Sequence, residues 1–171
     1  LFKTAVALEK TGKTQIVALD KTGTITRGEP EVTDMIPING RSEKELLAIA
    51  YALEKKSEHP LARAINQIAE HDGLSTDEVE QFQALPGNGL TALLNGTTLY
   101  GGSYQFVSEK IQISDEIKAK SEQLSEEGKT PLFFARDAEL YGIIAVADTI
   151  KEDSPQAIKE MQDMGIYVVM L

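Results

Sequence analysis

The sequence predicts an α/β protein in which an α+β domain with an antiparallel sheet is inserted into an incomplete parallel sheet. Two segments near the ends of the 171-residue chain, 15–20 and 166–171, contain apolar runs, as is typical of strands buried in a parallel sheet. Between them, segments 79–102 and 131–148 carry short strand patterns separated by turn residues, which is typical of antiparallel hairpins. An insertion explains why the ends and the middle of the chain differ.

The first forty residues are expected to contain one helix and two strands. Residues 3–10 are expected to form a short helix, and residues 15–20 a buried strand. Residues 21–29 are expected to form a loop, because Gly, Thr and a closing Gly-Glu-Pro interrupt the apolar pattern. Residues 31–36 alternate polar and apolar side chains, which predicts a strand.

A hairpin of two helices is predicted next. Ser42 and Glu45 have the spacing of a capping box, which opens the first helix. Pro60 fits the first turn of the second helix, and Gly73 ends it. The apolar positions that recur at helical spacing are Leu46, Ile49, Ala50, Leu53, Leu61, Ile65 and Ile68.

The remaining elements follow from turn and helix signals. Asn95-Gly96 is a strong hairpin signal between two strands. Gly128 ends one helix, and Ser154-Pro155 opens another that Gly165 closes. The expected strands are 79–85, 89–94, 97–102, 131–136, 140–148 and 166–171, and the expected helices are 103–110, 114–127 and 154–164.

The composition excludes several classes of site. The chain is 42% hydrophobic and 26% charged, which predicts a packed core. It has no cysteine and two histidines, so thiolate and multi-histidine metal sites are not expected. The net charge of −10 argues against nucleic-acid partners but not against ATP, because bound Mg²⁺ offsets phosphate charge. We find no signal peptide and no apolar run of membrane length, and the missing initial Met predicts a fragment.

Asp20 stands where a strand gives way to a loop. A carboxylate at the carboxyl end of a parallel strand lies where such sheets bind ligands, and it can attack phosphorus to form an aspartyl phosphate. Gly23 allows a tight turn, Thr22 and Thr24 offer hydroxyls, and Lys21 adds positive charge. The alternative is a plain strand-end or helix-cap aspartate, with Lys21 pointing into solvent.

The segment "DKTGTIT" at 20–26 resembles the phosphorylation motif of the P-type ATPases, cation pumps of the haloacid-dehalogenase-like superfamily. The resemblance implies that Asp20 is the phosphorylated nucleophile. It also implies that Thr22 contributes its carbonyl to Mg²⁺, alongside Asp20, and its hydroxyl to the phosphate, with Thr24 assisting. Soluble phosphatases of this superfamily carry an acid two residues after the nucleophile. Thr22 stands there instead, which predicts slow hydrolysis of the aspartyl phosphate.

A second resemblance lies at "SEHPLA", 57–62, which is similar to the Ser-Glu-His-Pro motif of the heavy-metal branch of these pumps. It implies that His59 and Glu54 contact the adenine of ATP. Gly87 and Gly89 in "LPGNGL" match a Gly-x-Gly of the same nucleotide-binding domain. The alternatives are that His59 caps the helix at Pro60 and that the glycines belong to a hairpin or bulge.

Three further segments bear on the site. "DTIK" resembles the family's hinge, so that Asp148 and Lys151 flank the nucleotide or the interdomain joint, or else carry loop charge before a helix. The family's usual Gly-Asn is replaced at Gly102-Ser103, which puts the polar contact at that corner in question. Two Gly-Lys-Thr triplets are not P-loops, because each leads into an expected strand instead of a helix.

The resemblance covers the chain from end to end. Residues 1–30 and 148–171 would belong to a Rossmann-like, haloacid-dehalogenase-like phosphorylation domain, and residues 31–147 to an inserted nucleotide-binding domain. The implied cofactors are ATP and Mg²⁺, with a transported ion, Cu⁺ by similarity to copper pumps, bound outside this segment. A zinc or cadmium pump, a soluble haloacid-dehalogenase-like phosphatase and a non-catalytic nucleotide-binding module remain as alternatives.

The same resemblance implies partners and a location. The implied partners are ATP, the membrane and actuator domains of the same pump and a copper chaperone for the intact protein, without nucleic acid. The implied location is the cytoplasmic face of the cell membrane. Since further family motifs would lie C-terminal to position 171, we expect this segment to bind nucleotide without turning over ATP by itself.

Overall fold

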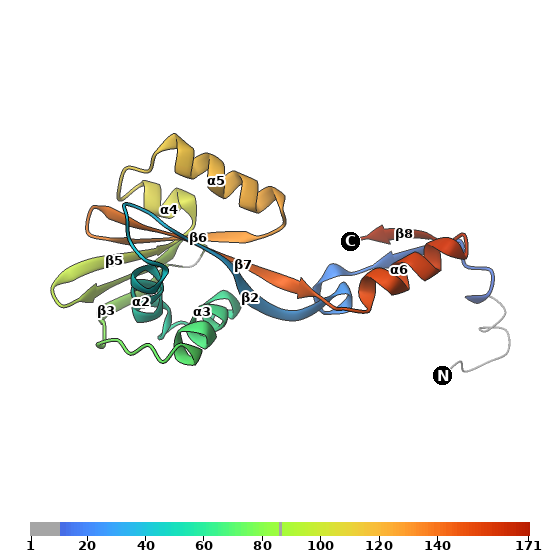
Figure 1. The fold of residues 1–171 in the computed structure, drawn as a ribbon, viewed down its shortest axis with the longest axis horizontal. Coiled ribbons are helices and arrows are strands. Elements are labelled where there is room, and N and C mark those ends of the chain that lie inside the picture. Colours follow the sequence, from blue (N-terminus) through green and yellow to red (C-terminus); the bar gives the residue numbers. More distant parts are fainter. Residues whose placement is uncertain (1–10, 86) are drawn as a thin grey trace. The chain divides into compact units, whose positions relative to one another are not determined.

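The computed structural model describes residues 11–85 and 87–171 (Figure 1). The helix predicted over 3–10 therefore lies outside the described residues. The chain divides into two compact units. The first unit comprises the described part of residues 1–29 together with Asp148–Leu171, and the second comprises Pro30–Ala147.

The first unit contains a parallel strand pair. Strand β1 (Ile16–Leu19) pairs in parallel with β8 (Tyr167–Met170), and helix α6 (Ser154–Asp163) precedes β8 (Figure 1). Pro155 lies in the first turn of α6, as predicted. The parallel pairing expected from the two apolar segments is confirmed.

The strand predicted over 15–20 is present as β1, but the expectation that it is buried is wrong. Ile16 is 63% exposed, and in the partner strand Tyr167 and Met170 are 69% and 56% exposed. An apolar strand is buried on both faces only where further strands and helices cover its sheet. Among the described residues this sheet consists of β1 and β8, so much of their apolar surface stays open.

The loop predicted over 21–29 is shorter than expected. A turn at Lys21–Ile25 follows Asp20, and strand β2 (Thr26–Pro37) already begins at Thr26. The Gly-Glu-Pro segment that suggested a loop lies inside β2. Pro30 is tolerated there because β2 is an edge strand of its sheet, where a missing amide donor costs no ladder bond on the open side.

A six-stranded sheet organises the second unit, in the order β2-β7-β6-β5-β4-β3. Antiparallel pairing joins β3 to β4, β4 to β5, β5 to β6 and β6 to β7. Asn95 and Gly96 both take positive φ, 51° and 77°, which confirms the predicted tight hairpin. The strands are β3 (Glu80–Leu85), β4 (Gly89–Leu94), β5 (Thr97–Gly102), β6 (Thr130–Arg136) and β7 (Glu139–Ile150).

Helices cover both faces of this sheet (Figure 1). They are α2 (Glu43–Glu54), α3 (Pro60–His71), α4 (Tyr104–Ser108) and α5 (Asp115–Glu126). Successive side chains of β6 point to opposite faces of the sheet. Phe134 packs in the hydrophobic core that includes residues of α2 and α3, and Phe133 packs in the one that includes residues of α4 and α5. The Ser42–Glu45 capping box is present and confirms the predicted start of α2.

Candidate functional site

Asp20 lies at the carboxyl end of β1, in the first unit. Its side chain is exposed and makes no capping hydrogen bond to the following turn. Gly23 takes φ 74°, a left-handed conformation that favours glycine and lets the chain reverse tightly. Lys21, Thr22 and Thr24 are exposed in the same turn. The residues assigned to the phosphoryl-transfer site are neighbours in the sequence, and in the structure their side chains are exposed at this turn.

Asp148 and Lys151 lie beside this turn, in the same unit. Asp148 Oδ1 accepts the backbone amide of Gly28 at 2.9 Å, and its Oδ2 accepts the hydroxyl of Thr26. Lys151 Nζ donates to the carbonyl of Gly23 at 2.9 Å. Sequence reasoning missed Thr26, whose partner Asp148 stands 122 positions away along the chain.

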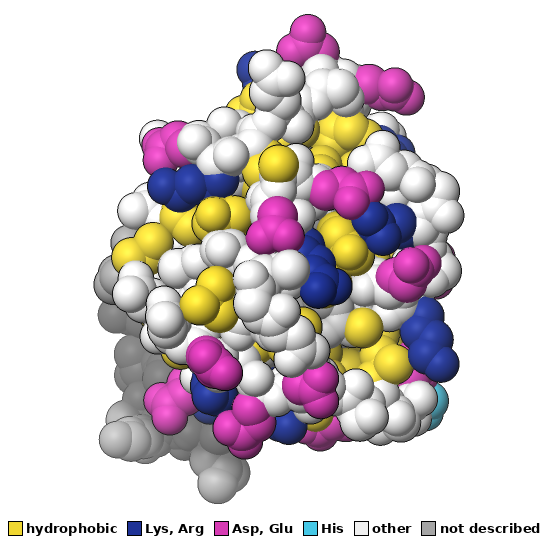
Figure 2. Space-filling model, turned by 90° about the vertical axis from the view of Figure 1, so that its left-hand side faces the viewer, with side chains coloured by type: hydrophobic (Ala, Val, Ile, Leu, Met, Phe, Trp, Pro, Cys, Tyr) yellow, Lys and Arg dark blue, Asp and Glu magenta, His cyan; other side chains and the backbone are white. Residues whose placement is uncertain are grey.

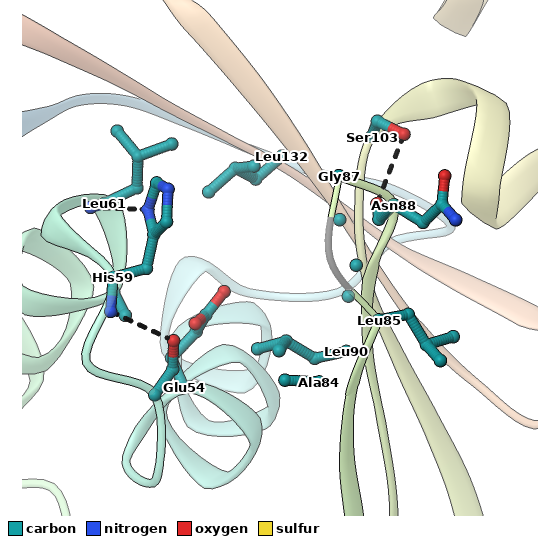
Figure 3. Close-up of a pocket in the computed structure, with 15 residues that line it drawn as sticks. Glu54, His59, Leu61, Ala84, Leu85, Gly87, Asn88, Leu90, Ser103 and Leu132 are labelled. Carbon is teal, nitrogen blue, oxygen red and sulfur yellow. Dashed lines mark hydrogen bonds between the residues drawn. The ribbon is translucent and has the colours of Figure 1, made fainter.

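The second unit contains a pocket of about 340 Å³ (Figure 3). Of the residues that the resemblance assigned to the nucleotide, Glu54, His59, Gly87 and Gly89 line this pocket, whereas Asp148 does not and belongs to the first unit. The four that line it come from the end of α2, the start of α3 and the turn between β3 and β4. The lining residues that the sequence did not assign include Ser57, Leu61, Leu90, Gly101 and Leu132. Leu132 comes from β6, which is distant in the sequence from the other lining residues, so it could be assigned to the pocket only once the order of the strands was known.

Glu54 is the one acidic side chain of this lining and is 5% exposed. Burial raises its pKa to about 7, although a hydrogen bond from Ser57 acts in the opposite direction. No Lys or Arg lines the pocket among the described residues. The pocket therefore offers apolar walls and one carboxyl group, and no positive side chain.

His59 occupies the N-cap position of α3. Its Nδ1 accepts the backbone amide of Leu61 at 3.2 Å, and its own amide donates to Ser57 Oγ at 3.3 Å (Figure 3). The capping contact and the pocket-lining position coexist in one side chain, so the two interpretations of His59 do not compete.

Glycines are required at the wall between β4 and β5 by close backbone approach. Gly89 pairs with Gly102 in the strand register. A β-carbon on Gly89 would lie 2.3 Å from the carbonyl oxygen of Gly101, and one on Gly102 would lie 2.6 Å from that of Asn88. Because backbone atoms cannot yield as side-chain tips do, larger residues at Gly89 and Gly102 would displace the wall of the pocket.

The corner at Gly102-Ser103 keeps polar contacts. Ser103 Oγ donates to the carbonyl of Asn88 at 3.3 Å (Figure 3). It also accepts the amide of Phe106 at 3.3 Å. Ser103 thus caps α4 and ties it to the turn between β3 and β4.

Other candidate features are absent from the described residues. The triplet at 12–14 leads into β1 and the triplet at 128–130 runs into the first residue of β6, so neither is followed by the helix that a P-loop requires. In residues 11–85 and 87–171, no three acidic, His or Cys side chains gather as a metal site. Within those same ranges, no helix combines the length and apolarity needed to cross a bilayer. On the face in Figure 2, acidic and basic side chains are interspersed, without a continuous basic area.

Comparison with known proteins identifies the family. The haloacid dehalogenase-like hydrolase family model matches residues 14–171. Over the whole chain, identity is 40% to the "Probable copper-importing P-type ATPase A" of Enterococcus hirae and 38% to the copper-exporting P-type ATPase of Bacillus subtilis. It is 41% to the cadmium-transporting ATPase of Staphylococcus aureus, over 97% of the chain. The chain spans 23%, 21% and 24% of the lengths of these relatives.

Solved structures agree with this assignment. A zinc-transporting PIB-type ATPase in the E2.Pi state matches 99% of the chain, with a TM-score of 0.86 and 36% identity, and the chain spans 27% of it. The N-domain of a copper-transporting P-type ATPase matches 67% of the chain and is itself covered to 98%, with a TM-score of 0.59 and 31% identity. The chain therefore belongs to the haloacid dehalogenase-like hydrolase family and is similar, along its whole length, to one segment of the heavy-metal-transporting P-type ATPases.

Proposed function

We propose that this chain is the ATP-binding and phosphorylation portion of a heavy-metal-transporting P-type ATPase, in which Asp20 carries the phosphoryl group. The observation that supports this most strongly is the convergence of Glu54, His59, Gly87 and Gly89 on one pocket. These residues were assigned to ATP by resemblance alone, and they come from separate segments of the chain. The proposal assigns residues 31–147 to nucleotide binding and residues 1–30 and 148–171 to phosphorylation.

The pocket suits the adenosine end of ATP. Leucine side chains supply apolar walls for a flat base, and Glu54 can accept a hydrogen bond from an exocyclic amino group. Because the described lining residues include no Lys or Arg, the pocket has no side chain to neutralise a triphosphate. In this proposal the second unit recognises the nucleoside and leaves the phosphates outside the pocket, where they can meet other groups.

Transfer of the γ-phosphate requires a carboxylate oxygen of Asp20 to attack phosphorus in line. A new oxygen–phosphorus bond forms, the bond to the β–γ bridging oxygen breaks, and ADP leaves with that electron pair. Asp20 and the carbonyl of Thr22 are hard oxygen donors that suit Mg²⁺, which takes few protein ligands and keeps several waters. When bound there, Mg²⁺ would neutralise charge on the phosphoryl oxygens.

Thr22 explains why the product would persist. An aspartyl phosphate is hydrolysed rapidly when a neighbouring acid or base activates water. The exposed hydroxyl of Thr22 cannot act as such a base near neutral pH. A long-lived phosphoenzyme is what a pump needs, and this counts against the soluble phosphatase.

The transported ion is proposed to be Cu⁺. The segments 1–13 and 142–166 resemble copper pumps more than zinc or cadmium pumps. Overall identity does not discriminate, since it is 40% to a protein named for copper import and 41% to one named for cadmium transport. A zinc or cadmium pump is therefore the second candidate, and metal-stimulated ATPase assays of the intact protein with Cu⁺, Zn²⁺ and Cd²⁺ would separate them.

The Asp20→Asn change in the intact protein tests the proposal. We expect loss of the acid-stable phosphoenzyme formed from radiolabelled ATP, because an amide is a poor nucleophile. Asp153→Asn is a matched control, since Asp153 is exposed in the same unit and makes no capping hydrogen bond. A phosphoenzyme that persists in Asp20→Asn would refute the nucleophile assignment. Separately, ATP titration followed by NMR should shift the signals of His59 and Gly89.

A further inference from the structure

We infer that Thr26, Asp148 and Lys151 form a clamp that positions the Asp20 loop for phosphoryl transfer. The inference rests on the proposed function of Asp20. It gives Thr26 a role that the motif does not, and it places Asp148 and Lys151 with the nucleophile's loop instead of with the nucleotide. The three are positioning residues: Thr26 and Lys151 bond to the backbone of the turn at Lys21–Ile25, and Asp148 holds Thr26 in place.

Thr26 is the centre of the clamp. It is 0% exposed, and its hydroxyl accepts the backbone amide of Gly23 at 3.2 Å and donates to Asp148 Oδ2. The carbonyl of Lys21 lies 3.0 Å from the same hydroxyl and also accepts the backbone amide of Thr26. A buried hydroxyl that contacts two backbone groups of one turn and a distant carboxylate fixes that turn against its surroundings.

Asp148 connects the clamp to the C-terminal segment of the first unit. One oxygen accepts the hydroxyl of Thr26 and the other accepts the amide of Gly28 at 2.9 Å. Both oxygens are thus used by the strand that follows the Asp20 loop. Hydrogen bonds to an ionised acceptor are roughly twice as strong as neutral ones, so Asp148 is a firm anchor for residues that stand more than a hundred positions earlier.

Lys151 completes the clamp from the opposite side of Gly23. Its Nζ donates to the carbonyl of Gly23 at 2.9 Å, while Thr26 holds the amide of the same residue. The backbone beside Lys151 is also attached: its amide donates to the carbonyl of Ile25 at 3.0 Å, and Ser154 Oγ donates to that carbonyl at 2.9 Å. Both polar groups of the left-handed glycine are therefore fixed, three positions after Asp20.

The clamp matters for rate because in-line attack depends on geometry. A misplacement of about 1 Å at a reacting group can cost roughly 100-fold in rate. The turn at Lys21–Ile25 contains non-helical backbone at Thr22 and Gly23, and Asp20 itself makes no capping bond. Contacts from outside the turn hold two of its residues: Thr26 and Lys151 bond to the backbone of Gly23, and Lys151 and Ser154 bond to the carbonyl of Ile25.

The test compares Thr26→Val with Thr26→Ser in the intact protein. Valine keeps the shape and removes the hydroxyl, whereas serine keeps the hydroxyl. In rapid-quench measurements with ATP, we expect phosphoenzyme formation to slow by about tenfold or more in Thr26→Val, with serine close to the wild type. The Kd for ATP, measured by calorimetry, should stay unchanged in both. Equal rates in the two variants, or a loss confined to ATP affinity, would overturn the clamp.

Lys151→Met provides a second test if the buried valine substitution prevents folding. Lys151 is only partly buried, so its replacement spares the core. We expect slower phosphoenzyme formation at saturating ATP, and an unchanged rate would overturn the role of Lys151. The two proposals fail separately. If Asp20→Asn still forms a phosphoenzyme, the proposed function is refuted. If Asp20→Asn forms none but Thr26→Val forms it at the wild-type rate, only the clamp is refuted.

Discussion

The Nδ1 atom of His59 accepts a hydrogen bond from the backbone amide of Leu61, 3.2 Å away. An amide can only donate, so Nδ1 carries no proton, and the neutral ring must hold its proton on Nε2. The ring that caps α3 also lines the pocket (Figure 3). One side chain therefore caps a helix and forms part of the wall of the pocket.

Substitutions at His59 should separate these two roles. His59→Ala removes the cap and the ring, so we expect the free energy of unfolding to fall by about 1 kcal/mol and ATP affinity to fall as well. His59→Asn retains a capping oxygen, so its stability should stay near that of the wild type while ATP affinity still falls. Urea unfolding and calorimetric ATP titration measure the two effects. If asparagine restored ATP affinity, the ring would have no role in binding.

Glu54 should make stability depend on pH. Its folded pKa is about 7, above the ordinary value of 4.5. Between these values the unfolded chain loses the proton while the folded chain keeps it, so the free energy of unfolding falls as pH rises from about 4.5 to about 7 and then levels off. A shift of this size corresponds to about 3 kcal/mol. Urea unfolding at a series of pH values measures this slope.

Glu54→Gln should remove that contribution, because glutamine does not titrate. We expect a flatter pH profile and a more stable protein at pH 8 than the wild type. Glu58→Gln is the matched control, since Glu58 is exposed four residues further along the chain. A wild-type profile in Glu54→Gln would show that the slope arises from another group.

Thr22→Asp should shorten the life of the phosphoenzyme. An acid at this position can activate water, and general acid–base catalysis typically contributes about 10²- to 10⁴-fold. We expect dephosphorylation in a chase with unlabelled ATP to accelerate by roughly tenfold or more in the intact protein. Asparagine has nearly the size of aspartate but no acid group, so Thr22→Asn should not accelerate dephosphorylation. Equal lifetimes in Thr22→Asp and Thr22→Asn would contradict the role assigned to this position.

Gly102→Ala should destabilise the second unit by about 2 kcal/mol or more, the cost of strain and overpacking together. The added carbon would lie 2.6 Å from the carbonyl oxygen of Asn88 and from the α-carbon of Gly89. Gly40→Ala is the control, because Gly40 also has positive φ but no atom within 4 Å of such a carbon. We expect about 1 kcal/mol there, from backbone conformation alone. Urea unfolding of the two variants decides whether close approach adds to the cost.

Local signals predicted the elements of this chain well. The Ser42–Glu45 box, the Asn95-Gly96 hairpin and Pro60 each act within a few residues, so the sequence displays them directly. The four pocket residues were identified by resemblance, and the structure places them together. Their roles toward ATP stay predictions until nucleotide binding is measured.

Interactions across long separations were not predictable in the same way. β2 begins at Thr26, and Asp148, 122 positions after Thr26 in the sequence, bonds to Thr26 and Gly28 at this start. Apolar patterning was also ambiguous about burial. β7 is buried along most of its length in an antiparallel sheet with helices on both faces, whereas β8, which contains no charged residue, is partly exposed. Whether an apolar strand is buried therefore depends on the helices and strands that cover it, and not on its own sequence.

The second unit occupies one continuous stretch, Pro30–Ala147, and its two ends lie on the neighbouring strands β2 and β7. The hydroxyl of Thr33 donates to the carbonyl of Ala145 at 3.3 Å, so the strands are still side by side close to those ends. A gene could therefore gain or exchange this unit as one continuous segment, joined at two nearby positions, without changing the order of the strands in the first unit. Under the proposed function, nucleotide recognition and phosphoryl chemistry could then diversify independently during evolution.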